Sequence, residues 1–360
     1  MIPLLVKREV NALFTIREKF REAHPDIAKM LESEKYDFLR TNEHLGDNIC
    51  LLGLGGSHAY GTNVEGSDVD IRGVAVNRVN EILGTENFEQ FENRETDTVV
   101  YGLKKFFGLL AACNPNIVEI VGLRPEDYIY ISPIGQMILD NMDLFLSKRA
   151  AASFGGYANA QLRRIQSATA RDRLPQHTKN KHISSSMQNA MDNLIRHHEL
   201  EKYGSIRIYA DEASGEVVLD AAFTRLPAGE FIDMTNTVRT VKLDYEKSAG
   251  NRNHKKDDLH MNKHANHLCR LYHMAIEILR DHEVNTYRTW DHELLMDIRN
   301  GKYMDEEGLF TDAFYDYVEK LEHDLELWKT DSTLPQTPDH QKINELLMFI
   351  NRQVVMNSER

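Results

Sequence analysis

The sequence predicts an α+β protein, in which a mixed β-sheet with flanking helices comes first and a mainly helical part follows. Short apolar runs rich in Val, Ile and Leu at 48–54, 69–76 and 97–101 are typical of strands. Farther along the chain, long stretches with apolar residues at helical spacing dominate. Because 360 residues exceed the usual size of one core, we expect two domains, 1–147 and 148–360.

The elements of the first domain follow from the pattern of apolar residues. An amphipathic helix is expected over 7–22, since Leu13 and Phe20 fall on one face of it. The run at 48–54 is almost continuously apolar, which indicates a buried strand. The remaining elements expected here are the strands 69–76, 97–101 and 128–132 and the helix 102–113.

The second domain is expected to be helical with one interruption. Helices are predicted at 150–168, 182–203, 258–281 and 311–329, and a last helix is predicted to begin after the capping residue Asp339. Alternating residues at 205–220 predict a small β-hairpin that turns at 213–215. The segment 166–181 is polar and basic, and we expect it to be mobile until a substrate binds.

One motif in the first domain points to chemistry. The apolar run before Gly55 ends in Gly-Gly-Ser, and the next apolar run carries Asp68 and Asp70 two residues apart. If both aspartates lie in a strand, they project from the same face and can hold a hard divalent cation. Glycines let backbone N–H groups approach a phosphate closely, and Ser57 adds a hydroxyl donor. The two halves of the motif are therefore expected to bind the same triphosphate.

Each half of this motif alone has an ordinary explanation. Gly-Gly-Ser is most often a simple turn, and acidic residues often decorate a solvated strand face. Here ten residues separate Ser57 from Asp68, and apolar, strand-like runs flank both halves. This combination favours a functional site.

The motif resembles that of the DNA polymerase β nucleotidyltransferase superfamily, which has an apolar residue, Gly, Gly or Ser, a spacer and Asp-apolar-Asp. More narrowly, residues 56–62 and 66–74 resemble the RNA-repair-pathway nucleotidyltransferase family. Further blocks similar to that family are Asn114-Pro115-Asn116 with Glu119, residues 263–271, and 298–301 with Glu306-Glu307. The resemblance covers roughly residues 45–350 and implies a polymerase-β-like catalytic domain.

The resemblance also implies a reaction and a set of site residues. The expected enzyme transfers a nucleoside monophosphate from an NTP such as ATP to an acceptor hydroxyl and releases pyrophosphate, using two Mg²⁺ or Mn²⁺ ions. Asp68, Asp70 and a third carboxylate would bind the metals. We expect Asp97 to be the third carboxylate and a possible general base, with Glu95 as the alternative because it would face the same side. The expected nucleotide-binding residues are Gly56, Ser57, Tyr60, Ser67, Arg72, Lys263, His267 and Arg270.

Histidines and cysteines in the sequence indicate no further metal site. His260, His264 and His267 lie one helical turn apart, but no cysteine or glutamate pattern typical of zinc accompanies them. The three cysteines sit in apolar segments and are expected to be reduced core residues. No apolar run of about 18 residues and no signal-peptide pattern occurs, so we expect a cytoplasmic protein without a membrane segment.

The charge of the chain does not decide which acceptor the enzyme uses. The net charge of −13 argues against a broad, non-specific grip on nucleic acid. However, the segment 148–182 holds eight Lys or Arg and one acid, and a second basic cluster runs over 239–263. These segments are either solvated surface or a wall that receives RNA. We expect an RNA 3′ end as acceptor, with a small molecule of the aminoglycoside type or a protein as the alternative. A non-catalytic nucleotide-binding or toxin–antitoxin module is the remaining possibility, and the oligomeric state is not predicted.

Overall fold

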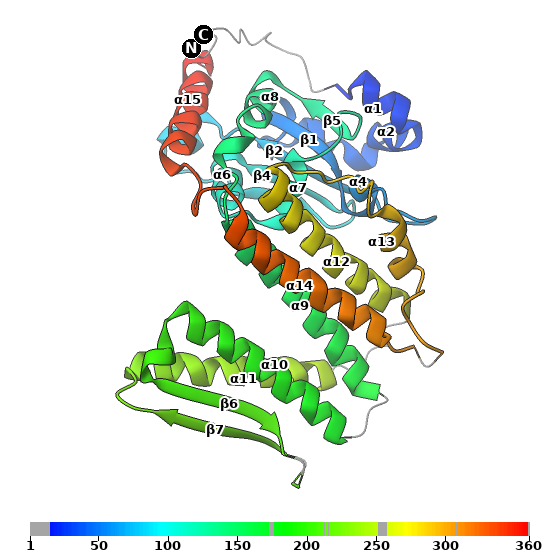
Figure 1. Ribbon diagram of the computed structural model, residues 1–360. Helices are drawn as coiled ribbons and strands as arrows, with labels where there is room; N and C mark the ends of the chain where they lie inside the picture. Colours follow the sequence, from blue (N-terminus) through cyan, green and yellow to red (C-terminus); the bar gives the residue numbers. More distant parts are fainter. Residues whose placement is uncertain are drawn as a thin grey trace. The chain divides into compact units, whose positions relative to one another are not determined.

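The computed structural model describes residues 15–172, 176–211, 213–214, 216–250, 258–306 and 308–358. The chain divides into two compact units. The first unit comprises Met1–Ala158, Cys269–Asp297 and Ala313–Arg360, and the second comprises Asn159–Leu268 and Ile298–Asp312. A mixed sheet with flanking helices occupies the early part of the chain and a mostly helical region follows (Figure 1), so the predicted α+β class is confirmed.

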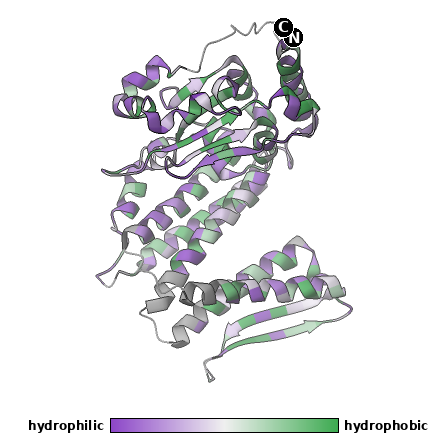
Figure 2. Ribbon diagram, turned by 180° about the vertical axis from the view of Figure 1, so that it is seen from behind, coloured by the Kyte–Doolittle hydropathy of each residue, from purple (hydrophilic) through white to green (hydrophobic). Residues whose placement is uncertain are grey.

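The sheet of the first unit has five strands in the order β3-β4-β2-β1-β5. Its strands are β1 (Ile49–Gly55), β2 (Asp70–Ala75), β3 (Gln90–Asn93), β4 (Thr98–Gly102) and β5 (Tyr128–Ile131). Strands β2 and β4 are parallel, and the other neighbours are antiparallel. All seven residues of β1 are buried, as its continuous apolar sequence requires. Figure 2 shows hydrophobic and hydrophilic residues mixed along the ribbons of this unit.

Helices from early and late parts of the chain belong to the same unit as this sheet. The helices and short 3₁₀ turns up to residue 158 are α1 (Glu18–Ala23), α2 (Pro25–Leu31), η1 (Glu34–Tyr36), α3 (Phe38–Thr41), η2 (Gly46–Asn48), α4 (Gly56–Tyr60), α5 (Val79–Leu83), α6 (Leu103–Ala111), α7 (Pro115–Val121), α8 (Pro133–Leu139), η3 (Met142–Leu144) and the start of α9 (Arg149–Asp172). Later segments add the end of α12 (Asp258–Asp281), most of α13 (His292–Arg299), and α14 (Asp312–Asp331) and α15 (His340–Ser358). Helix α15 packs against α5 and α6, so the last part of the chain completes the first unit.

The second unit contains a hairpin packed on helices. Its own elements are α10 (Gln176–His197), η4 (Leu200–Tyr203), β6 (Gly204–Ala210), β7 (Val217–Phe223) and α11 (Ala228–Gly250). Met191, Leu200 and Ile208 belong to the hydrophobic cluster that joins the helices to the hairpin. The predicted hairpin is thus confirmed, and so is the helix over 258–281.

Several predicted elements differ from the observed ones. Of the helix expected over 7–22, the part up to residue 14 lies outside the described residues. Residues 15–17 are not helical, because the Arg17 N–H donates to the carbonyl of Ile129 at 2.9 Å. The segment 166–181, which we expect to be mobile until a substrate binds, is helical over 166–172 and 176–181; its mobility stays a prediction. Strand β3 and helix α11 were not predicted.

Other local predictions are confirmed. Asp339 caps α15, since its carboxylate accepts a hydrogen bond from the N–H of Lys342 at 3.1 Å. Cys50, Cys113 and Cys269 are free and buried, as expected of core residues. Among the residues that the structure describes, no helix is both long and apolar enough to span a bilayer.

Candidate active site

The glycine loop lies directly against an aspartate. Strand β1 ends at Gly55, which pairs with Asp70 at the start of β2, and α4 begins at the next residue. Gly56 has a positive φ of +57°, and a Cβ atom there would lie 2.0 Å from Oδ2 of Asp70. Only glycine tolerates both this conformation and this approach. The backbone of the loop therefore forms one wall of the space beside the Asp70 carboxylate.

Arg72 joins this aspartate to the next strand. Its guanidinium donates to Oδ1 of Asp70 at 2.7 Å and also to the carbonyl oxygen of Asp97. Both Asp70 and Arg72 are half-buried. Arg72 therefore places a positive charge among acidic side chains at the edge of the sheet.

Two neighbouring aspartates act on the carboxyl group of Asp70. In the parallel pairing of β2 and β4, Ile71 is opposite Thr98, so Asp70 and Asp97 precede paired residues. Burial raises the pKa of Asp70 above its ordinary value, Arg72 opposes this, and the negative charges of Asp97 and Asp68 raise the pKa further. These carboxylates thus form one electrostatic cluster.

The strand geometry expected for the first two aspartates is only half right. Strand β2 begins at Asp70, so Asp68 lies in the preceding loop, where it is exposed, and strand alternation does not orient it. Asp97 is exposed in the turn before β4 and has a φ of +44°. Glu95 is exposed in the same turn between β3 and β4. Asp97 acts on the pKa of Asp70, which favours it as the third carboxylate, although that role stays a prediction.

A cleft of about 350 Å³ opens at the glycine loop and Asp70. Its lining residues come from β1, α4, β2, β3, β4 and α7: Leu54, Gly55, Gly56, Tyr60, Asp70, Arg72, Gln90, Glu92, Val99, Tyr101, Asn116, Glu119 and Ile120. Gln90, Glu92 and Tyr101 were not expected in the site. The polar-apolar-polar run Gln90-Phe91-Glu92 is the signal in the sequence that could have indicated strand β3, and its residues alternate between exposed and half-buried in the structure.

One side of the cleft is built by Tyr60, Glu119 and Arg270. The Tyr60 hydroxyl donates to Glu119, and Arg270 forms a 2.5 Å ion pair with the same carboxylate. The Arg270 guanidinium carbon lies 3.6 Å from the centroid of the Tyr60 ring. Burial raises the pKa of the Tyr60 phenol well above its usual range, an effect that Arg270 opposes, so Tyr60 stays a neutral donor.

Residues 27–188 match the model of the RNA repair pathway DNA polymerase beta family. The predicted family is thereby confirmed, and the matched segment contains the glycine loop, the three aspartates and Glu119. The similar blocks expected at 263–271 and 298–307 lie outside the matched residues and stay predictions. The match indicates a polymerase beta-like nucleotidyltransferase in an RNA repair pathway. Comparisons with curated proteins and with solved structures gave no match.

The remaining residues that the family resemblance suggested are placed as follows. Ser57 is half-buried in the first turn of α4, and the Ser67 hydroxyl accepts from the N–H of Val64 at 2.9 Å within the loop before β2. Lys263 is exposed and His267 is half-buried on the part of α12 that belongs to the second unit. Thus Gly56, Tyr60, Asp70, Arg72 and Arg270 come together in the first unit, whereas Lys263 and His267 are part of the other unit.

The family resemblance implies a divalent metal, and the donor set suits it. Asp68, Asp70 and Asp97 offer only oxygen atoms, which hard cations such as Mg²⁺ prefer. Among the described residues, no group of three or more His, Cys, Asp or Glu side chains is arranged to hold a metal ion on its own. Mg²⁺ is usually bound by one or two carboxylates together with substrate phosphates. A metal held jointly by the aspartates and a triphosphate is consistent with both observations.

Proposed function

We propose that this protein is a metal-dependent nucleotidyltransferase that transfers a nucleoside monophosphate from an NTP to an acceptor hydroxyl and releases pyrophosphate. The observation that carries the proposal is the contact between the Gly56 backbone and the Asp70 carboxylate at the cleft. A phosphate-binding loop and a metal-binding carboxylate must meet at one triphosphate. The closeness of the Gly56 backbone to the Asp70 carboxylate, which leaves no room for a side chain between them, supports these roles.

Each group of the cleft has a role in this reaction. The N–H groups of Gly56 and Ser57 and the Ser57 hydroxyl would bind the β- and γ-phosphates. Asp68 and Asp70 would hold the cations, with Asp97 beside the acceptor, where it could also accept the proton of the attacking hydroxyl. Bound Mg²⁺ or Mn²⁺ would supply activation of that hydroxyl and charge neutralisation of the leaving pyrophosphate.

Arg72 is the cation that the described cleft already contains. Its ion pair with Asp70 offsets part of the repulsion among the three aspartates. Guanidinium groups also bind phosphate in a bidentate manner. We therefore assign Arg72 to the phosphates of the NTP, with Asp70 accepting a divalent cation in place of Arg72.

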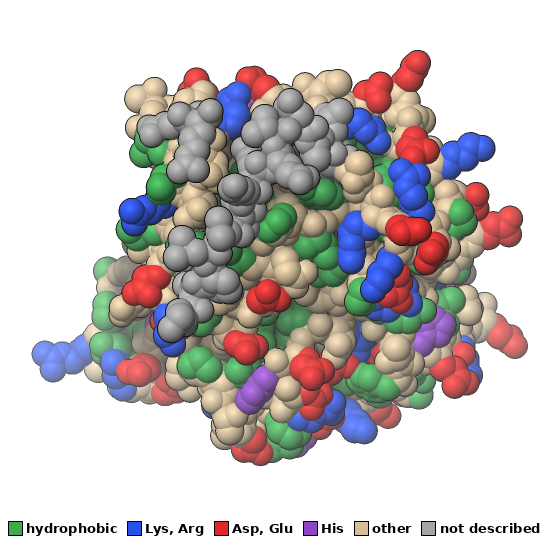
Figure 3. Space-filling model, turned by 90° about the horizontal axis from the view of Figure 1, so that it is seen from above, with side chains coloured by type: hydrophobic (Ala, Val, Ile, Leu, Met, Phe, Trp, Pro, Cys, Tyr) green, Lys and Arg blue, Asp and Glu red, His purple; other side chains and the backbone are tan. Residues whose placement is uncertain are grey.

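An RNA 3′ end is the acceptor that we favour, because the family match points to RNA repair. The basic segments 148–182 and 239–263 supply charges suited to an RNA backbone. Figure 3 shows acidic and basic side chains interspersed on one face of the molecule, with no broad basic area among the side chains coloured there. We therefore expect RNA binding to be local and to depend strongly on salt.

A small cationic acceptor is the second candidate. Three carboxylates, of Asp70, Glu92 and Glu119, line the cleft together with the single guanidinium of Arg72. Arg270 neutralises Glu119, but Glu92 is an exposed acid on β3. An acidic lining suits a polyamine-like acceptor such as an aminoglycoside better than it suits a phosphate backbone.

The test supplies each α-labelled NTP with Mg²⁺ or Mn²⁺ and three kinds of acceptor: single-stranded RNA, intact or nicked tRNA, and an aminoglycoside panel. The control is the Asp68→Ala/Asp70→Ala protein. Label that enters RNA only with the intact aspartates, and less so at high salt, supports the favoured acceptor. Label in the aminoglycoside supports the second candidate. If metal-dependent NTP binding occurs without transfer to any of them, a protein acceptor or a non-catalytic module becomes the better explanation.

A further inference from the structure

A connecting segment after α12 borders the glycine loop. In residues 285–292, the N–H of Arg288 donates to the carbonyl of Tyr60 at 3.0 Å, and Nε2 of His292 lies 2.8 Å from the carbonyl oxygen of Gly61. A Cβ atom on Gly61 would lie 2.4 Å from the Tyr287 ring, so this ring packs directly on the backbone of Gly61. The segment 285–292, which we call the strap, is thus fastened to the end of α4, the helix that begins with Gly56 and Ser57.

The strap presents an exposed indole. Trp290 is 62% exposed, which is unusual for the largest aromatic side chain. Its ring nitrogen donates to the buried carboxylate of Glu277, and its ring centroid lies 4.9 Å from that of His273. The guanidinium carbon of Arg288 lies 5.8 Å from the ring centroid. The indole is therefore held in one orientation although most of its surface is open to solvent.

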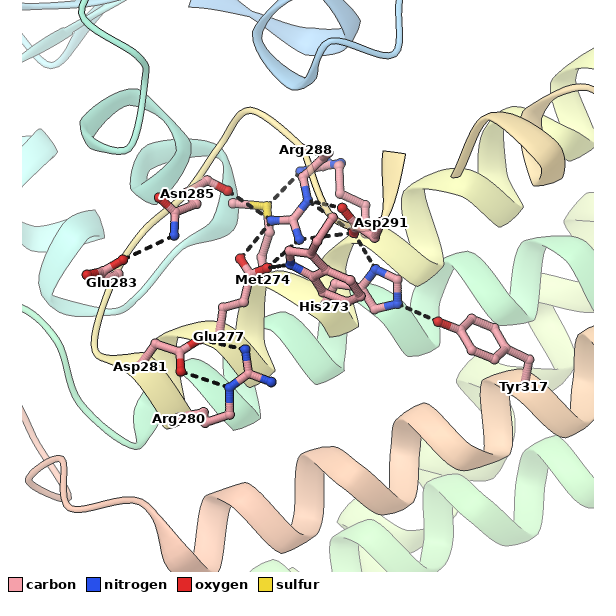
Figure 4. Close-up of polar contacts among 12 residues, drawn as sticks. His273, Met274, Glu277, Arg280, Asp281, Glu283, Asn285, Arg288, Asp291 and Tyr317 are labelled. Atoms are coloured by element: carbon pink, nitrogen blue, oxygen red, sulfur yellow. Dashed lines mark hydrogen bonds and ion pairs between the residues drawn. The ribbon is translucent and has the colours of Figure 1, made fainter. Parts of the chain in front are cut away.

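A buried ionic network fixes the strap and with it the indole. Arg288 donates to both oxygens of Glu277, at 2.8 and 2.6 Å, and to Asp291 at 3.0 Å. Nδ1 of His273 lies 2.5 Å from Asp291, and its Nε2 lies 2.7 Å from the Tyr317 hydroxyl. Figure 4 shows these groups converging from α12, the strap and α14. Burying such a cluster of charges costs desolvation energy, so the cluster is weak evidence for a stabilising role. A role in holding the strap and its indole in place would account for it.

We propose that Trp290 is a stacking platform for an unpaired nucleobase. An exposed indole of fixed orientation has already lost its rotational freedom, so a base that stacks on it pays little further entropy. Base–aromatic stacking tolerates any sequence, as an RNA-end enzyme requires. The strap's bonds to Tyr60 and Gly61 attach the segment that carries this platform to the C-terminal end of α4, the helix whose first turn holds Gly56 and Ser57. The inference rests on the proposed function and adds a nucleobase-binding site to it, the base coming either from the RNA end or from the NTP.

Fluorescence tests the platform without relying on catalysis. The chain contains two tryptophans, so Trp328→Phe leaves Trp290 as the only indole. This protein is titrated with single-stranded RNA, with NTP and Mg²⁺, and with blunt duplex RNA. Saturable quenching by single-stranded RNA is expected and assigns the platform to the acceptor, whereas quenching by NTP assigns it to the incoming nucleotide. Filter retention measures binding of each ligand independently. If a ligand binds and the emission of Trp290 stays unchanged, the proposal is overturned.

Variants of Trp290 complete the test. Trp290→Ala should weaken binding of the ligand that quenches by about tenfold, whereas Trp290→Phe, which keeps a stacking ring, should retain most of the affinity. Phe231→Ala is the matched control, since Phe231 is 59% exposed on α11 of the second unit and should leave affinity unchanged. Circular dichroism checks that each variant folds.

The two proposals fail separately. Nucleotidyl transfer with normal affinity in folded Trp290→Ala overturns the platform and leaves the proposed function in place. Quenching of Trp290 by RNA in a protein that transfers no nucleotide keeps the platform and removes the enzyme.

Discussion

The Arg270 guanidinium carbon lies 3.6 Å from the centroid of the Tyr60 ring, while the same guanidinium is ion-paired with Glu119. This stack joins α12 to α4 and α7, three helices far apart in the sequence. Arg270 is fully buried, and Tyr60 and Glu119 are among the groups that stabilise its charge. A substitution of either Tyr60 or Glu119 should therefore disturb this wall of the cleft.

Removing only the acid from this pair should destabilise the protein. Glu119→Gln removes the carboxylate that forms the ion pair with the buried Arg270 guanidinium, and we expect the free energy of unfolding to fall by about 3–5 kcal/mol. Urea unfolding followed by circular dichroism measures it. The control is Glu119→Gln combined with Arg270→Met, which removes both charges and should recover much of the loss. Equal loss in the single and double variants would show that the charge pair is not the cause.

Gly56→Ala should abolish activity through displacement of Asp70. The new Cβ atom would lie 2.0 Å from Oδ2 of Asp70, so the carboxylate must move, and a shift of about 1 Å at a catalytic centre can cost roughly 100-fold in rate. The measurement is single-turnover nucleotidyl transfer. Gly66→Ala is the matched control, because Gly66 also has a positive φ of +79° but has nothing within 4 Å of the added Cβ. A similar rate loss in both variants would implicate backbone strain instead.

Neutralising the carboxylates one at a time should show how much each of them contributes to metal binding. Asp70→Asn and Asp68→Asn are expected to remove nearly all transfer at any Mg²⁺ concentration, because the metals lose their ligands. Asp97→Asn should also lower the rate strongly, whereas Glu95→Gln should have little effect. Rates measured across a Mg²⁺ and Mn²⁺ series decide this. The reverse result for Asp97 and Glu95 would make Glu95 the third carboxylate.

Acid should weaken the contact between the N-terminal helices and β5. Burial alone would raise the pKa of Asp127, but hydrogen bonds from His24 at 2.8 Å and Arg124 at 2.8 Å outweigh it and hold the pKa below the ordinary 3.8. A carboxyl whose pKa is lower in the folded state stabilises the fold above its unfolded pKa, and this contribution is lost as pH falls through the folded value.

We therefore expect wild-type stability to decline on acidification below about pH 4, the range in which an unfolded aspartate titrates. Urea unfolding at pH 7 and at steps down to pH 2.5 measures the decline. Asp127→Asn should be less stable at pH 7 and should show a shallower pH dependence. Parallel pH profiles for the two proteins would contradict the assignment.

The sequence predicted those parts of the fold that depend on continuous apolar runs. Strands β1 and β5 and helix α12 were predicted because their apolar residues show the period of the element. Strand β3 was missed because Gln90–Asn93 is an edge strand with polar, partly exposed residues. Helix α11 was missed because its buried residues are sparse, while Phe231 and Ile232 on it are exposed.

Within the site, local residue types were predictable and tertiary pairing was not. Gly56 and Asp70 could be predicted as site residues because the glycine turn and the pair of aspartates lie in adjacent segments of the sequence. Arg270 gave no sign of being buried, since arginine is rarely buried unless it is paired, and its partner Glu119 is 151 residues away. The contribution of Glu92 to the cleft likewise depends on a strand pairing that no short-range pattern specifies.

The division of the first unit into three separated stretches of chain has a consequence for how the molecule is made. The family match ends at residue 188, yet the unit that contains the cleft also needs 269–297 and 313–360. Arg270 and helix α15 are therefore still missing when a ribosome has synthesised the matched segment. The first unit can be completed only after residues 313–360 have emerged, and a gene fragment that stops at residue 188 would encode an unfinished core.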